Sequence, residues 1–354
     1  MINLLDRYIA RSVIASIVLV IFIITGLDII FATVDELQNL QAEYQVLQAL
    51  QYVSITVPKR IYEFLSLSVL LGCLVGLGAM ANHSELTVMR AAGMSVSRIA
   101  WAATKPALLV VCLGTLVGEY VVPYTEGFAQ SQRAVAKSSD KAISSREGYW
   151  HREGNNYMHF NAVLPGGVIY GVTQYHFNQN RELEHARYAS RAIFQGGYWM
   201  LQSVVVTEFT PDRAEQKVHP TLRWDTDLTP ELLQLQVIKP EDLSIRGLYQ
   251  YAAYLAEQGL NVQKYRLAYW KKIFQPLATV VMVLVALSCI FGPLRSVTMG
   301  FRVFTGVMLG LLFKYTEDFL GPASIVFGFE PFYASLFPIL LFCLLAMLLL
   351  KRAS

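Results

Sequence analysis

Six long apolar segments constrain this chain more than any other feature of its sequence. Each has about the 20 residues that an α-helix needs to cross a bilayer. They are residues 12–34, 61–81, 99–122, 273–291, 303–321 and 332–350. Only 16% of the residues are charged, against about 25% in average soluble domains. We therefore expect an integral membrane protein, whose first segment stays as an anchor because no small-residue cleavage site follows it.

Basic residues in the short loops predict the orientation of these segments. With the N-terminus in the cytoplasm, that side carries eight bases: Arg7, Arg11, Arg90, Arg98, Arg295, Arg302, Lys351 and Arg352. The opposite short loops and helix ends hold only Lys59, Arg60 and Lys314. Because cytoplasmic loops carry an excess of Lys and Arg, we expect a multi-pass membrane protein with both termini cytoplasmic, which in a double-membraned bacterium would lie in the inner membrane. Residues 1–123 would form three membrane helices, 124–264 a periplasmic domain, and 265–354 three more helices.

The exported stretch is rich in strand-forming residues. Its runs of Val, Tyr, Phe, Trp and Thr alternate with turn clusters such as Gly196-Gly197, which predicts an antiparallel meander. In the run 198–209 one face carries Trp199, Leu201, Val205 and Phe209, and the other carries Tyr198, Met200, Val204 and Val206. Two apolar faces favour a sandwich or jelly roll over a single solvated sheet. The expected fold is thus a membrane α+β protein, with six transmembrane helices (3+3) around a jelly-roll-like domain. Its interior could hold an apolar ligand or be an ordinary packed core.

Two helices are expected after the strands. Ser244 is a good N-cap for a helix that runs to Gln258, and Gly259 is a typical stop. A second helix begins near Val262 and continues into the fourth membrane segment, where Pro276 predicts a kink.

Motifs for enzyme chemistry are absent from the sequence. No glycine is followed by lysine, so the chain has no GxxxxGK[ST] phosphate loop, and it lacks HExxH, GxSxG and GxGxxG. Neither its four cysteines nor its six histidines have metal-site spacing. We expect no catalytic residue, no metal and no cofactor bound by this chain. The net charge of +3 is too small to indicate a nucleic-acid partner.

Two acidic residues lie deep in predicted membrane segments, where ionisable groups are costly and often functional. Asp28 and Glu63 could form part of a proton relay. That hypothesis makes the chain a proton-coupled transporter of a lipid or small molecule. Snorkelling to the membrane surface, a structural role, or a membrane-anchored periplasmic scaffold are the alternatives.

A short amphipathic helix is predicted in the cytoplasmic loop between the second and third segments. Ser84 can cap it, Leu86, Met89 and Arg90 lie on it, and Gly93 ends it. The helix could lie on the membrane or dock into another protein. Anionic lipid favours a broad basic face, which this loop lacks, so we favour docking to a protein.

Three groups of residues resemble one known family. They are Leu5-Asp6-Arg7-Tyr8-Ile9, the loop residues Ser84-Glu85-Leu86, Val88-Met89 and Ala92-Gly93, and the FGPLRSVTMG segment at 291–300. Together they resemble the LptF/LptG family of lipopolysaccharide-export permeases, over the whole chain. The GPLR sequence and the Asp-Arg-Tyr opening favour the LptG branch.

The resemblance implies a half-transporter. Family members pair as LptF with LptG, bind a dimer of the LptB ATPase, and pass lipopolysaccharide through periplasmic jelly rolls to LptC and LptA. ATP and Mg would then be held by the partner ATPase, and membrane lipid would surround the helices. Family members can carry lysines near the outer end of the first helix. Ala32, Gln38 and Asn39 stand there in this chain, so we do not expect this helix to bind phosphate.

Three sets of site residues follow from the residues and the resemblance together. The predicted ATPase-coupling set is Glu85, Leu86, Met89, Arg90 and Gly93. The predicted lipopolysaccharide-binding set is Lys59, Arg60, Arg133, Lys137, Lys271 and Lys272, with interfacial anchoring to phospholipid as the alternative. The predicted acyl-chain conduit is Trp199, Leu201, Val205 and Phe209.

Overall fold

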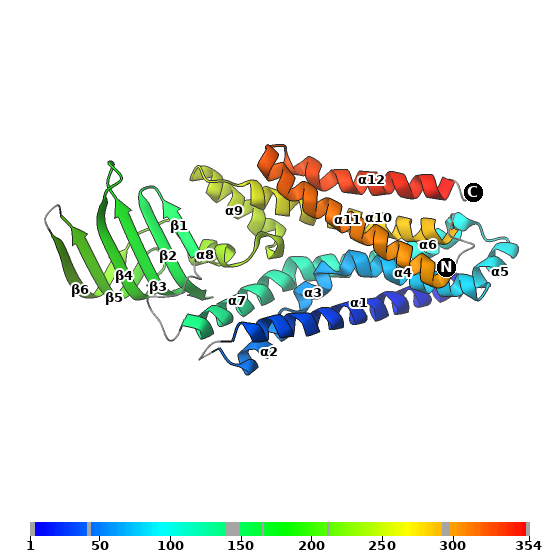
Figure 1. Cartoon of the computed structure of the whole chain (residues 1–354), viewed down its shortest axis with the longest axis horizontal. Helices are drawn as coiled ribbons and strands as arrows, with labels where there is room; N and C mark the ends of the chain where they lie inside the picture. The colour runs from blue at the N-terminus through cyan, green and yellow to red at the C-terminus, as the bar shows by residue number, and fades with distance from the viewer. Residues whose placement is uncertain are drawn as a thin grey trace.

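The chain folds into a helical bundle with a β-sheet at one end (Figure 1). The computed structural model describes residues 4–40, 44–138, 149–164, 166–210, 213–291 and 298–351. The start of the first helix and the end of the last helix both lie at the end of the bundle remote from the sheet (Figure 1). The predicted order of helices, strands and helices is therefore observed.

Five helical stretches among the described residues are long and apolar enough to cross a membrane. They are α1 (Leu4–Gln38), α4 (Leu65–Asn82), the continuous stretch Ser97–Ala134, α10 (Gln263–Phe291) and α12 (Pro331–Lys351). The sixth predicted segment lies in α11 (Met299–Phe327), which is also 29 residues long. Its charged residues Lys314, Glu317 and Asp318 reduce its apolar character. Whether α11 crosses the membrane stays a prediction.

The third predicted segment does not end at Val122 as expected. The helix α6 (Val96–Leu116) continues through a five-residue π-helix, η1 (Val117–Val121), into α7 (Val122–Ser138). Pro123 lies inside this continuous helix, directly after the π turn, where it removes one backbone N–H from the hydrogen-bond ladder. The expected boundary between residues 123 and 124 therefore falls inside a helix.

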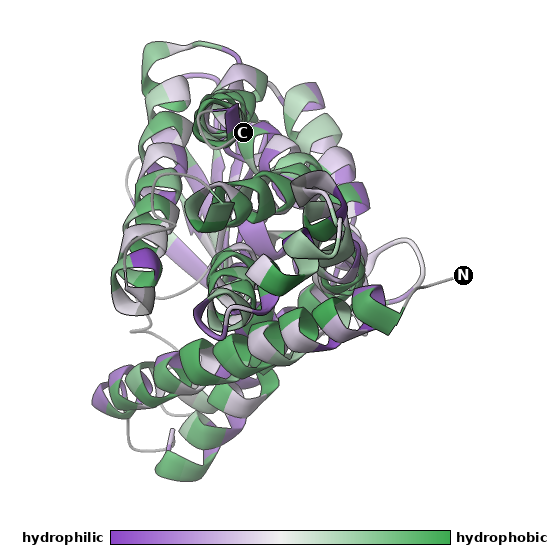
Figure 2. Ribbon diagram, turned by 90° about the vertical axis from the view of Figure 1, so that its right-hand side faces the viewer, coloured by the Kyte–Doolittle hydropathy of each residue, from purple (hydrophilic) through white to green (hydrophobic). Residues whose placement is uncertain are grey.

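The helices pack around α4 and α10. In each of these two helices, 61% of the residues in an apolar stretch of 18 residues are buried. The close approach of α1 and α4 depends on Gly72, because a Cβ there would lie 2.5 Å from the Cα of Ile17. In α1 only 22% of the residues in the equivalent apolar stretch are buried. Hydrophobic residues predominate along the long helices (Figure 2), and some of them are exposed, such as Phe22 of α1 and Leu312 of α11, as expected for surfaces that meet lipid or another helical chain.

The described strands form one antiparallel sheet in the order β1-β2-β3-β4-β5-β6. These strands are β1 (Tyr149–Glu153), β2 (Asn156–Leu164), β3 (Val168–Phe177), β4 (Leu183–Phe194), β5 (Trp199–Phe209) and β6 (Ala214–Trp224). The meander prediction is confirmed, and the predicted run 198–209 corresponds to β5. The jelly roll is not confirmed, since the described strands belong to a single sheet in sequence order.

Side chains in β5 do not alternate strictly between the two faces. Trp199 and Leu201 are buried, but beyond Ser203 the buried residues are Val204 and Val206. Ser203 has a φ of 52°, and a residue in this left-handed region breaks the two-residue period of an extended strand. The expectation that Val205 shares a face with Trp199 is therefore wrong, and Phe209 is 40% exposed.

The buried face of the sheet is partly covered by the segment that follows it. Trp199 is fully buried, and its Nε1 donates a hydrogen bond to the carbonyl oxygen of Leu228 at 2.7 Å. Leu233 of α8 (Pro230–Val237) belongs to the same apolar cluster. This end of the sheet is thus an ordinary packed core.

The helix after the strands forms as predicted. It is α9 (Ile245–Glu257), and the Ser244 hydroxyl accepts a hydrogen bond from the Gly247 N–H at 3.0 Å. Gly259 follows it with a φ of 66°. The next helix, α10, begins at Gln263 and continues through Pro276. Three short helices were not expected: α2 (Val46–Ile55), α8 and the 3₁₀ turn η2 (Pro240–Asp242).

Candidate functional site at the sheet-side mouth of the bundle

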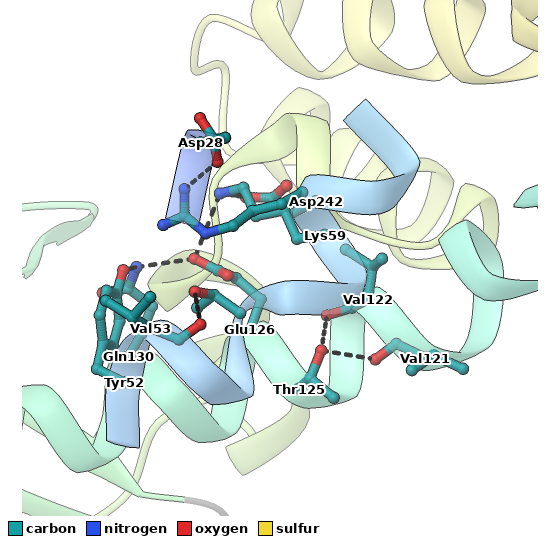
Figure 3. Close-up of polar contacts among 12 residues, drawn as sticks. Asp28, Tyr52, Val53, Lys59, Val121, Val122, Thr125, Glu126, Gln130 and Asp242 are labelled. Carbon is teal, nitrogen blue, oxygen red and sulfur yellow. Dashed lines mark hydrogen bonds and ion pairs between the residues drawn. The ribbon is translucent and has the colours of Figure 1, made fainter. Parts of the chain in front are cut away.

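Lys59 joins three segments at the end of the bundle that faces the sheet, which we call the sheet-side mouth (Figure 3). Lys59 lies on α3 (Val57–Glu63). Its Nζ is 2.6 Å from Oδ2 of Asp242 in η2 and 3.4 Å from Oε1 of Glu126 in α7. The Gln130 amide donates to the same Glu126 oxygen at 2.8 Å and to the Tyr52 hydroxyl at 3.0 Å. A single ammonium therefore holds η2 against α3 and α7.

Burial sets the protonation behaviour of the ion pair between Lys59 and Asp242. The side chains of Asp242 and Glu126 are only 7% and 1% exposed. Burial raises the pKa of Asp242 to about 6, although the Lys59 ammonium opposes the rise. The two carboxylates in turn raise the pKa of Lys59 in spite of its own burial. At neutral pH the pair is ionic, and the carboxyl of Asp242 begins to protonate in mild acid.

Arg60 and Arg133 line a second part of the mouth. Arg60 Nη1 lies 2.5 Å from Oδ2 of Asp28, and Arg133 Nε lies 2.8 Å from Oε1 of Glu36. Tyr44 donates to the same Glu36 oxygen at 2.9 Å. Both guanidinium groups line a cavity of about 770 Å³ between α1, α7 and the segment 238–240. We call it the arginine cavity.

Lys272 is not available to a ligand, which corrects its assignment to the lipopolysaccharide-binding set. It is 7% exposed, and its Nζ donates to the carbonyl oxygens of Gly118, at 2.8 Å, and of Leu243. The Glu119 carboxylate lies 3.8 Å away and accepts a hydrogen bond from the Ile245 N–H at 3.0 Å. Lys272 thus ties α10 and η1 to the start of α9.

Lys271 is the neighbour of Lys272 in the sequence, but its side chain faces a cavity. Its Nζ is 3.7 Å from Oδ1 of Asp318 on α11. Both residues line a cavity of about 530 Å³ between α4, α10 and α11, which we call the α11 cavity. Glu63, one of the two acids singled out in the sequence, also lines it, whereas Asp28 is paired with Arg60.

The structure brings five of the six predicted bases to the sheet-side mouth, and the Lys137 side chain lies outside what it describes. Each of the five has a carboxylate within 4 Å: Lys59, Arg60, Arg133, Lys271 and Lys272. No sequence pattern predicted these partners, because Lys59 and Asp242 are 183 residues apart. Any phosphate that binds here has to compete with protein carboxylates.

The predicted coupling residues lie at the opposite end of the bundle, on α5 (Glu85–Ala91). Leu86 and Met89 are 4% and 7% exposed and belong to the apolar core of the bundle. They therefore cannot also fill a pocket of a partner in this conformation, which corrects that part of the prediction. Val88 is 65% exposed, and Glu85 accepts a hydrogen bond from the Tyr8 hydroxyl at 3.2 Å.

The ends of α5 differ in how well they follow the prediction. Ser84 has a φ of 61° and makes no capping hydrogen bond, so the expected N-cap is not observed. Gly93 has a φ of 90°, a conformation that glycine adopts without strain. Thr87, Val88 and Arg90 are exposed, so the accessible surface of α5 carries one apolar and one basic side chain.

Comparison with known proteins covers nearly the whole chain. The family model described as "Lipopolysaccharide export system permease LptF/LptG" matches residues 7–352. The lipopolysaccharide export system permease protein LptG of Escherichia coli (strain K12) is 38% identical over 358 residues, covering 99% of both chains. The protein of the same name from Haemophilus influenzae is 36% identical over 355 residues, again covering 99% of both. The similarity includes the helices on both sides of the sheet and the sheet itself.

Proposed function

Because the chain belongs to the lipopolysaccharide export permease LptF/LptG family, we propose that it is an LptG-type subunit that moves lipopolysaccharide out of the inner membrane. The family match over residues 7–352 carries this proposal. The membrane-length helices support it, because a lipid substrate has to be taken from the bilayer. The chain would act as a permease, and ATP hydrolysis would take place in a separate subunit.

The proposed arrangement in the membrane has six crossings, with α11 as the fifth. The 29-residue length of α11 supports this, as does its packing against α4 and α12. The start of α1 and the end of α12 lie at the end of the bundle remote from the sheet (Figure 1). That position fits an even number of crossings, with the termini and α5 in the cytoplasm and the sheet in the periplasm.

The proposed partners are an LptF-type permease, an LptB-type ATPase dimer that holds ATP and Mg, and LptC and LptA. An export system implies several components, and α1 offers apolar side chains such as Phe22, which is 77% exposed. Co-purification from detergent tests this set. Isolation of the full chain alone, without an ATPase or a second helical subunit, would count against the proposal.

Arg60 and Arg133 are the best-placed groups for lipopolysaccharide phosphates. A guanidinium can bind phosphate through two parallel hydrogen bonds, and both side chains already line the arginine cavity. Replacing both by glutamine is expected to lower co-purified lipopolysaccharide about tenfold, since a charged hydrogen bond contributes about 1.5–3 kcal/mol. Lys105→Met, on exposed α6 surface, is the matched control. Wild-type lipid content in the double variant would place the headgroup site elsewhere.

The exposed face of α5 is the proposed contact with the ATPase. Val88→Glu is expected to weaken ATPase association without lowering the melting temperature, because the Val88 side chain is 65% exposed. Leu86→Ala is expected to destabilise the chain by about 2–5 kcal/mol, as buried truncations do. Pull-down of the ATPase together with thermal melts separates the two effects. Normal association of Val88→Glu would rule out this face.

The sheet is the proposed path for acyl chains, and photo-crosslinking tests it. Val204 and Val206 point to the buried face, whereas Val205 and Thr207 are only partly buried. Crosslinkers at Val205 and Thr207 are expected to capture lipopolysaccharide during ATP hydrolysis because these side chains are accessible, and those at Val204 and Val206, which are buried in the packed core, are the control. Trp199 should capture none because it is packed against Leu228. Equal capture from both pairs would contradict a one-sided path.

A further inference from the structure

A five-residue π-helix interrupts the long helix that runs from the bundle towards the sheet. This π turn, η1, joins α6 to α7. π-helices are rare, and many of those known lie at functional sites. Gly118 of η1 lies directly against α3, since a Cβ there would come within 2.1 Å of the Tyr62 ring. The π turn therefore has a fixed neighbour on this side.

Glu119 of the π turn holds the start of α9. Both of its carboxylate oxygens lie 3.0 Å from the nitrogen of Ile245, the first residue of this helix. A carboxylate at the N-terminus of a helix is stabilised by the unpaired N–H groups there. The Lys272 ammonium of α10 lies 3.8 Å away and adds a second attraction. One side chain of the π turn therefore fixes the position of α9.

The other end of α9 contacts the sheet. The Tyr254 hydroxyl lies 3.1 Å from Nε2 of His151 in β1, and the two rings stack with their centroids 6.0 Å apart. His151 is buried. Ile245 and Tyr254 are separated by nine positions of α9, which correspond to about 13.5 Å at 1.5 Å per residue. The helix lies between the sheet and α10 (Figure 1), so it can carry a displacement of the π turn to the sheet.

The helix α7, which continues from the π turn, contacts the sheet as well. The Ser131 hydroxyl donates a hydrogen bond to the carbonyl oxygen of Val163 in β2 at 3.1 Å, and both residues are buried. Conversion of the π turn to a regular α-helical turn would shift α7 by one residue, about 1.5 Å along its axis and about 100° around it. The same conversion would change where Glu119 points. A change in η1 therefore acts on α7 and α9 together.

We propose that the π turn couples the membrane helices to the sheet, and that Glu119 is the positioning residue through which α9 takes part in this coupling. The proposal rests on the lipopolysaccharide export proposed above, and it names the part of the chain that keeps the sheet aligned with the sheet-side mouth during export. Glu119 acts on the lipid only through α9. This helix moves as one unit because Leu248 and Tyr251 are buried in the protein, and packed rigid elements can carry coupling between distant sites.

Hydrogen exchange of the full-length chain with its co-purified partners tests the linkage without lipopolysaccharide. Glu119→Gln removes the charge and keeps the size of the side chain. Amide exchange in β1 is expected to become about tenfold faster in this variant, as the loss of a charged hydrogen bond allows. Glu330→Gln, at an exposed acid before α12, is the matched control. Faster exchange at Ile245 with wild-type exchange in β1 would show that Glu119 stabilises α9 alone, and would overturn the proposal.

Tyr254→Phe tests the opposite end of α9 with a change too small to unfold the chain. It removes the hydroxyl that meets His151 and keeps the ring. Tyr249→Phe, at a residue that is 69% exposed on the same helix, is the matched control. The quantity measured is the lipopolysaccharide captured by a crosslinker at Val205 for each ATP hydrolysed by the co-purified partners.

Glu119→Gln and Tyr254→Phe are each expected to lower this ratio several-fold, with assembly and ATP hydrolysis unchanged. The double variant should lower it no further than the stronger single variant, because the two substitutions break one linkage at its two ends. Effects that multiply in the double variant, or an unchanged ratio in both single variants, would overturn the proposal. Wild type that captures no lipid would contradict the proposed export function instead, and the exchange of β1 would still decide the linkage.

Discussion

Replacing Lys59 by methionine is expected to destabilise the chain by about 3–5 kcal/mol, the cost of removing one partner from a buried ion pair. The substitution leaves Asp242 and Glu126 next to each other without the ammonium that holds both. The measurement is thermal unfolding of the purified protein in detergent at neutral pH. Lys105→Met is the matched control, because that lysine is exposed and lies over the Trp101 ring, 5.7 Å from its centroid. A melting temperature equal to wild type would show that the pair is not buried in solution.

The deficit of Lys59→Met is expected to shrink in mild acid. The pKa of Asp242 in the folded chain is about 6, above its ordinary value. This carboxyl therefore favours folding at low pH, and its contribution falls as the pH rises through about 6. Removing Lys59 makes the charged form of Asp242 even less favourable, because the ammonium that stabilises it is lost. Melts at about pH 5 and about pH 7.5 should show the larger loss at the higher pH. Adding Asp242→Asn to Lys59→Met should recover part of that loss, whereas a pH-independent deficit would contradict this account.

Replacing Lys272 by methionine is expected to cost a similar amount, about 3–5 kcal/mol, because it leaves the buried Gly118 and Leu243 carbonyls without their donor. The connection between α10 and the start of α9 should loosen as a result. Hydrogen exchange of the Ile245 amide, which is bonded to Glu119, is expected to become faster.

Lys271→Met is the matched control for this effect on stability. Its ion pair with Asp318 is long, at 3.7 Å, and half-exposed, so we expect a change of at most about 1 kcal/mol. Equal destabilisation by the two substitutions would contradict the different roles of these neighbouring lysines. Wild-type exchange at Ile245 in Lys272→Met would show that the lysine does not hold this connection.

Features with a local cause could be predicted from the sequence. Apolar runs of membrane length became helices, and alternating Val, Tyr and Thr runs separated by turns became the strands of the meander. Ser244 and Gly259 ended α9 as their backbone preferences require. The clustering of bases at one end of the bundle was also predictable, because helices of similar length bring their ends to one level.

Where each apolar stripe or charge points was decided by the tertiary structure alone. From the sequence, the apolar side of α5 could face either a partner or this chain's own bundle. In the structure Leu86 and Met89 are buried in the core of the bundle. Lys271 and Lys272 are adjacent in sequence, yet only the second turns into the protein. Ser203 reversed the faces of β5 through one positive φ.

The sequence by itself determined the helices, the strands and the end of the bundle at which the bases gather, because these depend on residues within one or two turns of each other. Only the tertiary structure decided which base meets which acid. Lys59 reaches Glu126 over 67 residues and Asp242 over 183. Pairs at such separations form only when helix packing sets both the distance and the burial of the two groups, and neither quantity is encoded near either residue.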